Sequence, residues 1–423
     1  MQKGRQFLSL TPLIVFLAVY LVTSIVTGDF YRVPISAAFL LACIYGVCVA
    51  QGPLKERLGH FLRGAGHENV LLMIMIFLLA GAFAGTAKDM GAVEATVGAT
   101  LNLMPGSMLY AGLFLTACFI SMAVGTSVGT IVALMPLGAG IAAETGISTA
   151  HLAAIVVGGA FFGDNLSFIS DTTIAATRAA GCAMRDKFRT NIRITAPAVI
   201  VVTVIYLFQG QSVSFLTQHQ DVDWVKMLPY LLVIALALTG QNVTIILTIG
   251  IAAAAVIGFA YGDFTWTSWL DSLGRGLGGM SDLIIVTMLA GGMLELIRAG
   301  GGLDLIVRGL THRISGSRGA QLAIAALVSL ANVCTANNTI AIITVGGIAK
   351  DITDRFGVAP RKLASLLDTF SCLVQGILPY GAQILMAAGI AGLAPTAIIP
   401  HLYYPAIMGL CALGSIFFNY PKR

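Results

Sequence analysis

The sequence predicts an all-α membrane protein that crosses the bilayer many times. Only 10% of its 423 residues are charged and 57% are hydrophobic, whereas a soluble domain carries about 25% charged residues. Many apolar stretches reach about 17–20 residues, the length of a bilayer-crossing helix, and are apolar on every face, unlike the alternating strands of a β-barrel. A soluble domain and a disordered chain are thus excluded. The lack of a basic stripe also argues against nucleic-acid binding.

The apolar segments fall into two series of six. The first series lies at 10–27, 33–50, 70–87, 107–142, 151–180 and 194–211. The second lies at 228–242, 243–261, 280–297, 318–349, 363–390 and 396–418. Equal numbers of segments in the two halves suggest a duplicated chain.

Matching residues support the internal repeat. Residues 79–81 and 289–291 both read Leu-Ala-Gly, at an offset of 210. Residues 124–131 match 333–340 at an offset of 209, with valine, threonine and isoleucine at equivalent positions. We therefore expect an N-terminal repeat at 1–211, an external linker at 212–227 and a C-terminal repeat at 228–423.

The distribution of basic residues predicts the orientation of the chain. With the N-terminus in the cytoplasm, 20 of the 24 Lys and Arg residues fall in the loops that counting spans places inside. Loop 51–69 then lies inside and its repeat partner 262–279 outside. The two repeats are predicted to be inverted, with both termini cytoplasmic, as in many secondary transporters.

Two segments are predicted to fold back on themselves. Segments 107–142 and 318–349 each return to the side from which they start, as two full spans or as a re-entrant hairpin, and we favour hairpins. This gives about ten transmembrane helices plus two re-entrant hairpins. Polar residues at mid-depth need protein or a watery cavity around them. The candidate ion-binding residues at the two tips are Thr126, Ser127 and Thr130, and Thr335, Asn337, Asn338 and Thr339.

Segment 151–180 holds two carboxylates, Asp164 and Asp171, seven residues apart. A charge at the centre of a membrane helix costs at least about 2.5–3.5 kcal/mol, so it calls for a function. An interrupted helix here would free carbonyls that, with carboxylates, bind a hard cation. The structural alternatives are a helix cap for Asp164 and a pair with Arg178 for Asp171. The other candidate ligands are Asn165, Ser167, Ser170 and Thr172.

Segment 363–390 in the second half is also predicted to be interrupted. Gly376, Pro379 and Gly381 favour a break in the helix. Asp368 and Gln375 are candidate ligands there. For Asp368, ion binding and a paired role at the membrane edge near Lys362 are equally open.

Residues 163–173, Gly-Asp-Asn-Leu-Ser-Phe-Ile-Ser-Asp-Thr-Thr, resemble the signature of the NhaC family of sodium/proton antiporters. That signature usually reads Gly-Asp-Lys-Leu-Ser-Pro-Leu-Ser-Asp-Thr-Thr. Asn165 replaces the usual lysine, which makes the site one charge more negative. Phe168 replaces the usual proline, which weakens the case for a sharp break. The resemblance implies sodium coupling, no cofactor, and a place in the bacterial plasma (inner) membrane.

These observations predict a secondary active transporter and not an enzyme, since no H-E-x-x-H or similar motif occurs. The leading function is Na⁺/H⁺ antiport that exchanges cytoplasmic Na⁺ for external protons, with Asp164 and Asp171 as Na⁺ ligands. The alternative is sodium- or proton-coupled transport of an amino acid or small carboxylate. No basic residue is predicted at the midplane, which disfavours an anion. The expected partners are the lipid bilayer, Na⁺ and H⁺; an organic substrate and a homodimer stay open.

Overall fold

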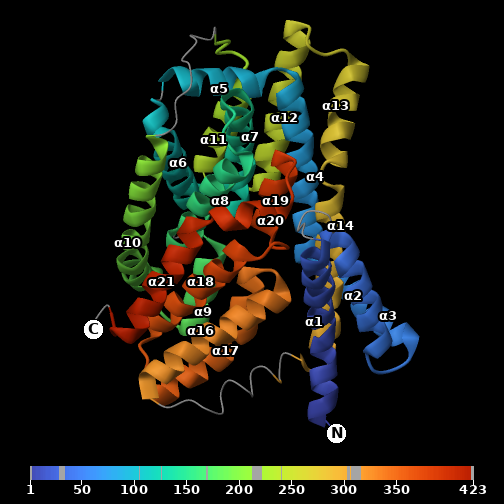
Figure 1. The fold of residues 1–423 in the computed structure, drawn as a ribbon, viewed down its shortest axis with the longest axis vertical. Helices are drawn as coiled ribbons and strands as arrows, with labels where there is room; N and C mark the ends of the chain where they lie inside the picture. Colours follow the sequence, from blue (N-terminus) through green and yellow to red (C-terminus); the bar gives the residue numbers. More distant parts are fainter. Residues whose placement is uncertain are drawn as a thin grey trace.

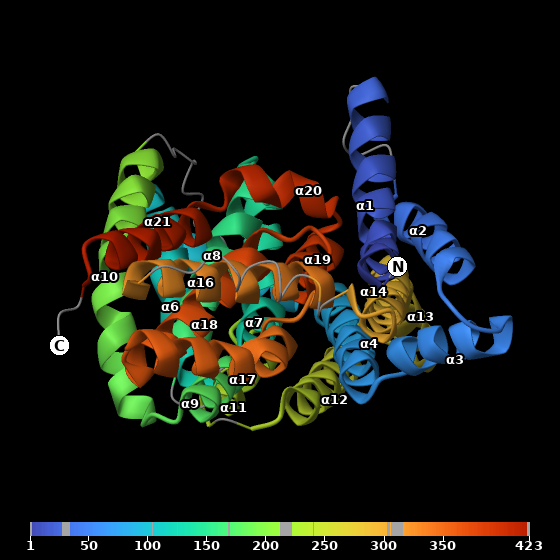
Figure 2. The same cartoon turned by 90° about the horizontal axis from the view of Figure 1, so that it is seen from below.

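The computed structural model describes residues 2–27, 34–103, 105–124, 126–167, 170–211, 222–239, 241–302, 305 and 316–420. Every regular element within these ranges is a helix, so the all-α prediction is confirmed. The predicted linker 212–227 lies mostly outside the described residues. Figures 1 and 2 show two groups of helices side by side, which we call the first and second helix groups.

The first helix group takes elements from both halves of the chain. Its members are α1 (Gln2–Thr27), α2 (Ile35–Val49), α3 (Leu54–Ala65), α4 (Glu68–Asp89), α12 (Val243–Tyr261), α13 (Trp266–Gly278) and α14 (Ser281–Ala299). In Figure 1, α3 lies towards the lower end of this group, near the N-terminus, and α13 lies at the upper end.

The second helix group also combines both halves. From the first half it takes η1 (Gly106–Met108), α6 (Leu109–Val124), α7 (Ser127–Thr145), α8 (Thr149–Leu166), α9 (Asp171–Ala180) and α10 (Met184–Gly210). From the second half it takes α16 (Gly316–Thr335), α17 (Asn338–Phe356), α18 (Pro360–Ile377), α19 (Ala382–Ala391), α20 (Pro395–Ile398), η2 (Ile399–His401) and α21 (Tyr403–Phe417). The helices α5 (Ala92–Leu103) and α11 (Leu228–Leu238) pack against this group through α7 and α6.

Among the described residues, seven or eight helical spans can be counted, where the sequence predicts about ten. Seven of the described helical segments are long and apolar enough to cross a membrane, with the segments 149–180 and 360–391 each counted once, or eight if the bent pair 395–401 and 403–417 is one span. Three further apolar stretches are shorter, namely Gln6–Tyr20 within α1, Ile35–Val49 (α2) and Gly106–Met122 in η1 and α6. The sequence count included these segments because each is apolar, although the apolar helix in each is shorter than the others. The chain is an integral membrane protein.

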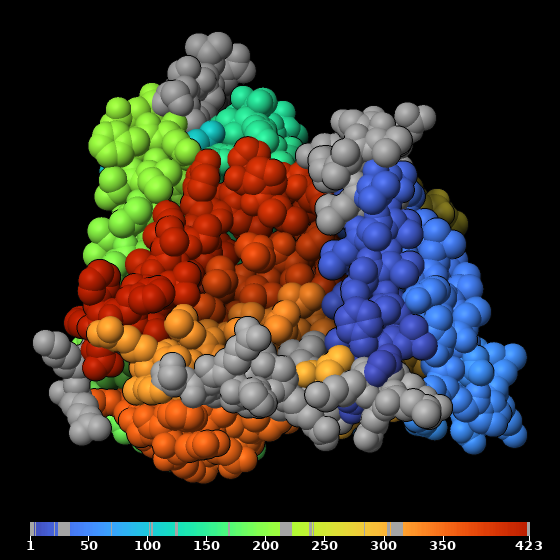
Figure 3. Space-filling view, turned by 60° about the horizontal axis from the view of Figure 1, so that its bottom comes forward, coloured from blue at the N-terminus to red at the C-terminus, as the bar shows by residue number. Residues whose placement is uncertain are grey.

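Two helix–turn–helix units occupy the segments predicted as hairpins. The first joins α6 to α7 at residues 125–126, and the second joins α16 to α17 at 336–337. Thr126 caps α7 by accepting a bond from the Gly129 backbone N–H at 3.5 Å, and Asn337 caps α17 in the same way from Ile340 at 2.9 Å. The polar tips are therefore helix caps that allow the chain to reverse. Figure 3 shows α17 (orange) on the face that also carries α1 and α3 (blue).

Two long apolar segments are interrupted where the sequence predicts. The first, 149–180, is divided into α8 and α9 by residues 167–170, and the second, 360–391, into α18 and α19 by residues 378–381. Phe168, which replaces the usual proline, lies outside the described residues, but α8 ends before it and α9 begins after it. Backbone groups next to both interruptions are free to bind side chains or ions.

Several contacts between helices join segments that the predicted internal repeat treats as equivalent. In the second helix group α7 packs against α19, and its repeat partner α17 packs against α9. In the first group a methyl on Gly64 of α3 would overlap the carbonyl of Gly291 in α14. A methyl on Gly276 of α13 would likewise overlap Gly81 in α4. The two halves thus contact each other through equivalent, reciprocal pairs of helices.

Candidate functional site

Asp164 is a buried carboxylate held by the tip of the first helix–turn–helix unit. It lies in the last turn of α8 and is 5% exposed. The Ser127 backbone N–H donates to Asp164 Oδ1 at 2.9 Å, and the Ser127 hydroxyl donates to Oδ2 at 2.5 Å. Because Ser127 is the first residue of α7, the positive end of that helix also faces the carboxylate. Within the described residues no Lys, Arg or His pairs with Asp164.

Close packing of α6 against α8 positions this carboxylate. A methyl group on Gly159 would overlap Ala117, and one on Gly163 would overlap Ser121. The Ser121 hydroxyl donates to the Ala160 carbonyl, across the same contact. Since α6 leads directly into the turn before Ser127, this contact sets the distance between Ser127 and Asp164.

Two glutamines continue the hydrogen bonds from Asp164 to the second helix–turn–helix unit. Gln383 Nε2 donates to Ser127 Oγ at 2.9 Å, and Gln375 Nε2 donates to Gln383 Oε1 at 2.9 Å. Gln375 Nε2 also donates to the Ala336 carbonyl at 3.0 Å. Gln375 Oε1 is buried and accepts no hydrogen bond from the part of the chain that the structure describes. It is a free oxygen ligand next to this polar chain.

In the alignment of the two predicted repeats, the hydrogen bond between Ser127 and Asp164 and the one between Gln375 and Ala336 fall at equivalent positions. The offset of 209 pairs Ser127 with Ala336, and the offset of 211 pairs Asp164 with Gln375. Each half thus bonds its helix–turn–helix tip to its interrupted helix at the same point. The first half has a carboxylate there and the second half a neutral amide.

Asp368 is fully buried, but it is neutralised. Lys187 Nζ lies 2.5 Å from Asp368 Oδ2, and both side chains are at most 1% exposed. Lys362, the residue considered as its partner, instead donates to Ser415 Oγ at 2.8 Å and to the Tyr420 carbonyl at 2.9 Å. Nothing in the sequence indicated a buried lysine, because it predicts only that no basic residue lies at the membrane midplane, whereas Lys187 is buried inside the protein. The basic stretch from 185 is the packed start of α10 and not a loop.

Asn165 and Asn191 complete this second polar cluster. Asn191 Nδ2 lies 2.7 Å from Asn165 Oδ1 and 3.1 Å from Asp368 Oδ2. Lys187 Nζ donates to the Asn165 carbonyl at 2.6 Å. A lysine from α10 thus lies beside the residue that replaces the usual lysine of the 163–173 motif.

The remaining residues predicted at the first interruption separate into two environments. Ser167, Ser170 and Thr172 are buried, and Thr172 Oγ1 donates to the Asp164 carbonyl at 2.9 Å. Ser170 and Thr172 also share a hydrogen bond of 2.8 Å. Asp171 is exposed and lines a cavity of about 450 Å³. In the described part of the chain it pairs with neither Arg178 nor any other base, and no hydrogen bond joins it to Asp164.

The residues predicted at the two tips also make different kinds of contact. Thr130 donates to the Thr126 carbonyl at 3.0 Å within its own helix, and Thr335 donates to the Asn337 carbonyl at 3.0 Å. Asn338 Nδ2 lies 4.0 Å from Cys372 Sγ, and Thr339 lines the same cavity as Asp171. Of the seven tip residues, only Ser127 contacts Asp164 directly.

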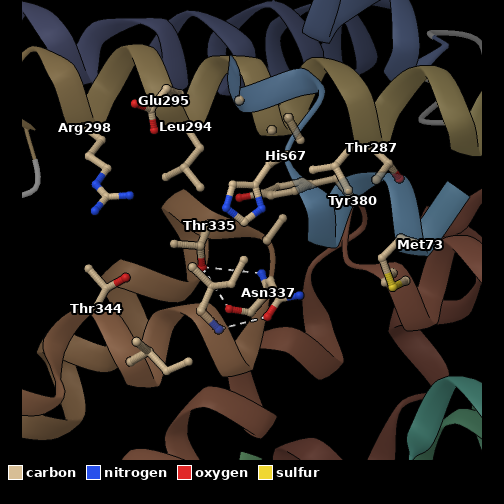
Figure 4. A pocket seen from close by; sticks show the side chains of 18 residues that line it. His67, Met73, Thr287, Leu294, Glu295, Arg298, Thr335, Asn337, Thr344 and Tyr380 are labelled. Atoms are coloured by element: carbon tan, nitrogen blue, oxygen red, sulfur yellow. Dashed lines mark hydrogen bonds between the residues drawn. The ribbon is translucent and has the colours of Figure 1, made fainter. Parts of the chain in front are cut away.

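A larger cavity of about 480 Å³ lies between the two helix groups (Figure 4). Thr335, Asn337 and Thr344 line it from the second helix–turn–helix unit, and Tyr380 lines it from the second interruption. Glu295 and Arg298 of α14 line the opposite wall and point away from each other. Ala336, also in its lining, accepts the bond from Gln375, so the cavity reaches the polar chain to Asp164.

Comparison with known proteins adds to this geometry. The model of the Na⁺/H⁺ antiporter family matches residues 5–211 and 227–420. The chain belongs to the Na⁺/H⁺ antiporter family. The predicted resemblance is confirmed, and so, at the level of the family, is the predicted class of function, secondary active Na⁺/H⁺ antiport.

Individual relatives are distant but cover much of the chain. The malate-2H(+)/Na(+)-lactate antiporter of Bacillus subtilis is 23% identical over 464 residues, with 100% of this chain and 96% of that protein covered. The Na(+)/H(+) antiporter NhaC of Alkalihalophilus pseudofirmus is 26% identical over 331 residues, with 70% and 69% covered. The solved structure of the Alcanivorax borkumensis YdaH transporter covers 91% of this chain and 99% of that one, at 14% identity and a TM-score of 0.44. That likeness is too weak to support an inference.

Three site residues of this family member were missed from the sequence. Gln383, Lys187 and Asn191 all contact predicted residues. Lys187 and Asn191 are one turn apart on the buried face of α10, which continues with Ile194 and Thr195. That helical spacing is a signal in the sequence, but the surrounding basic residues obscure it. Nothing in the sequence marks Gln383 as a site residue, apart from its position just after the predicted interruption of segment 363–390.

The Ser127→Ala variant tests the contact that holds Asp164. Losing a hydrogen bond to a charged group weakens an interaction by about 1.5–3 kcal/mol, so we expect the Na⁺ concentration for half-maximal antiport to rise at least about tenfold. The measurement is Na⁺-dependent proton flux in proteoliposomes. Thr130→Val is the matched control, because among the described residues its hydroxyl donates to the Thr126 carbonyl and not to Asp164. An equal effect of both variants would contradict the specific role of Ser127.

Proposed function

We propose that this chain is a Na⁺/H⁺ antiporter in which the Asp164 carboxylate binds Na⁺ and H⁺ in alternation. The observation that carries the proposal is a buried carboxylate with two donors from Ser127 and no basic partner in the described residues. An unpaired buried charge is costly, so the carboxylate must take up a cation or a proton when it is closed from water. Because both ions compete for one charge, binding of one releases the other. That competition produces obligatory exchange.

Oxygen atoms around Asp164 suit a hard cation. Sodium prefers carboxylate, hydroxyl and amide oxygens, as other hard cations do. Asp164 offers two carboxylate oxygens, and Ser127 offers its hydroxyl. Further along the same chain of hydrogen bonds, beyond Ser127 and Gln383, Gln375 Oε1 is a buried amide oxygen that has no donor in the part of the molecule described. We therefore place the transported ion between the first helix–turn–helix tip and the second interrupted helix. Asp171 stays a predicted ligand, now at the exposed start of α9.

Several observations support an inverted arrangement of the two repeats. The helices α3 and α13 are repeat partners and lie towards opposite ends of the first helix group (Figure 1). The reciprocal pairs α7–α19 and α9–α17 are expected of two halves related by a two-fold axis in the membrane plane. In this arrangement the two helix–turn–helix units are re-entrant from opposite sides, both termini are cytoplasmic, and the membrane is the bacterial plasma membrane.

The cavity of about 480 Å³ is then the cytoplasmic entrance. It is lined by Arg298 and Glu295, which belong to the end of α14 that the basic-residue count places inside. At its inner end the polar chain through Gln375 and Gln383 leads to Ser127 and Asp164. An ion that enters here moves along neutral oxygens and amides before it meets the carboxylate.

Flux measurement in proteoliposomes tests the function. A pH-sensitive dye inside the vesicles would be followed after external Na⁺, Li⁺ or K⁺ is added to the purified protein. We expect proton movement with Na⁺ and no organic solute present. Proton movement that requires an organic solute would contradict plain antiport.

The size of the same cavity favours a second candidate, coupled transport of a small carboxylate. A volume of about 480 Å³ exceeds the space that one hydrated ion needs, and an arginine lines it. Arginine binds carboxylates through two parallel hydrogen bonds. The Bacillus subtilis relative that aligns with the whole chain is named a malate-2H(+)/Na(+)-lactate antiporter.

The Arg298→Gln variant separates the two candidates. If a carboxylate binds to Arg298, we expect its uptake to fall at least about tenfold, because a charged hydrogen bond of about 1.5–3 kcal/mol is lost. Na⁺/H⁺ exchange without organic solute should change less than about twofold, since Arg298 does not contact the chain to Asp164. Arg318→Gln, an exposed arginine outside the cavity, is the control. Full carboxylate uptake by Arg298→Gln would exclude the arginine as the anchor.

A further inference from the structure

The ammonium group of Lys187 has a complete set of oxygen partners. Its Nζ lies 2.5 Å from Asp368 Oδ2, 2.6 Å from the Asn165 carbonyl and 2.6 Å from Thr173 Oγ1. A lysine ammonium has three N–H bonds, so each has one acceptor. The side chains of Lys187, Asp368 and Thr173 are at most 2% exposed. The ammonium is therefore enclosed, charged and satisfied.

The same oxygens would form a cation site if the lysine were absent. A carboxylate, a backbone carbonyl at a helix end and a hydroxyl are the ligand types of hard-cation sites. The Asn165 carbonyl is available because α8 ends at Leu166, one residue later. The distances of 2.5–2.6 Å are close to the 2.3–2.6 Å at which Ca²⁺ binds oxygen. Both interrupted-helix segments contribute, since Asn165 lies in α8 and Asp368 in α18.

The two buried carboxylates therefore differ in one respect. Within the described residues, Asp164 is contacted by hydrogen-bond donors and by no basic group, whereas Asp368 is paired with an ammonium cation that is part of the chain itself. Asn191, one turn from Lys187, bonds both Asn165 and Asp368 and holds α10 against the cluster. A cation that is part of the chain cannot dissociate, so it keeps Asp368 from exchanging ions.

We propose that Lys187 permanently fills a second cation site formed by Asp368, the Asn165 carbonyl and Thr173, so that of the two buried carboxylates only Asp164 exchanges ions. The inference rests on the proposed function, whose stoichiometry it sets at one exchanging carboxylate in each cycle. Removing the lysine charge should open the second site to Na⁺. In the intact antiporter, activation by Na⁺ should show no cooperativity.

The test measures Na⁺ binding without relying on transport. All variants carry Asp164→Asn, which removes the proposed transport site. We compare thermal unfolding of Asp164→Asn, of Asp164→Asn with Lys187→Met, and of the triple variant that adds Asp368→Asn. Sodium replaces choline at constant ionic strength. Binding of Na⁺ at about 100 times its Kd should raise the melting temperature of the Lys187→Met protein by about 3 °C or more.

The single variant Asp164→Asn and the triple variant serve as the controls. The triple variant has neither charge of the pair and should show no Na⁺ shift. If the double variant, Asp164→Asn with Lys187→Met, melts at the same temperature in Na⁺ and in choline, the second site does not exist. If it fails to fold in both salts while the triple variant folds, the uncompensated carboxylate is not rescued by Na⁺ and the proposal is also overturned. A Na⁺ shift that persists in Asp164→Asn alone would instead contradict the proposed function.

Discussion

Replacing Asp164 by asparagine should abolish Na⁺-driven proton movement while the protein folds normally. The amide has the shape of the carboxylate and can still accept the Ser127 N–H bond, but it can neither carry a negative charge nor exchange a proton. Losing about 3 kcal/mol of interaction with the ion corresponds to a decrease in affinity of roughly 100-fold. We expect antiport to fall to the level of empty liposomes.

Stability separates a lost ion site from a misfolded protein. Because a neutral amide is easier to bury than an unpaired carboxylate, Asp164→Asn should melt at the wild-type temperature or above it. Stabilisation by Na⁺ should disappear at the same time. Glu144→Gln, an exposed carboxylate in α7, is the control and should keep full activity. Wild-type exchange by Asp164→Asn would refute the site.

The Asp171→Asn variant shows which of the two predicted sodium ligands contributes more to antiport. The motif at 163–173 gives both aspartates equal standing, but only Asp164 is buried and bonded to Ser127. Exposure to water weakens the interaction of a carboxylate with an ion. The exposed position of Asp171 therefore predicts a smaller loss of antiport than at Asp164.

Much of the fold was predictable because membrane helices are marked by length and apolarity. The two helix–turn–helix units followed from polar tips within apolar segments, and the interruptions followed from Gly163, Asn165 and Pro379 beside charged or polar residues. These features are local, so a single sequence displays them. The helix count was less accurate, because short apolar helices such as α2, which has 15 residues, were counted as full spans.

The pairing inside the site could not be predicted from the sequence. Lys187 stands among Arg185, Arg189 and Arg193, and basic residues in such a run normally lie in a cytoplasmic loop. Its partner Asp368 is 181 positions away in the sequence, and nothing local links them. The substitution of Asn165 for lysine was interpreted as an added negative charge. In the folded protein, Lys187 of α10 brings a positive charge next to Asn165.

Replacing Gly163 by valine should destabilise the protein and abolish antiport together. Any Cβ at this position overlaps the Ser121 backbone as well as its side chain, and a backbone cannot rotate away. Inserting side-chain atoms into a packed interior costs about 1–3 kcal/mol, and we expect at least the upper value here. Since Asp164 is the next residue, separation of α8 from α6 also moves the carboxylate away from Ser127.

A glycine with open space around it supplies the control. Gly414 in α21 has no atom within 4 Å of an added Cβ. Alanine there should leave the melting temperature unchanged or raise it, because alanine favours a helix by about 0.8–1 kcal/mol over glycine. The melting temperature of Gly163→Ala should lie between those of Gly163→Val and Gly414→Ala. Adding Ser121→Gly should recover part of the lost melting temperature, because it removes the side-chain overlap. If Gly163→Val melts like Gly414→Ala, the α6–α8 contact does not position Asp164, and the geometry around Ser127 must be maintained by α7 and α19 instead.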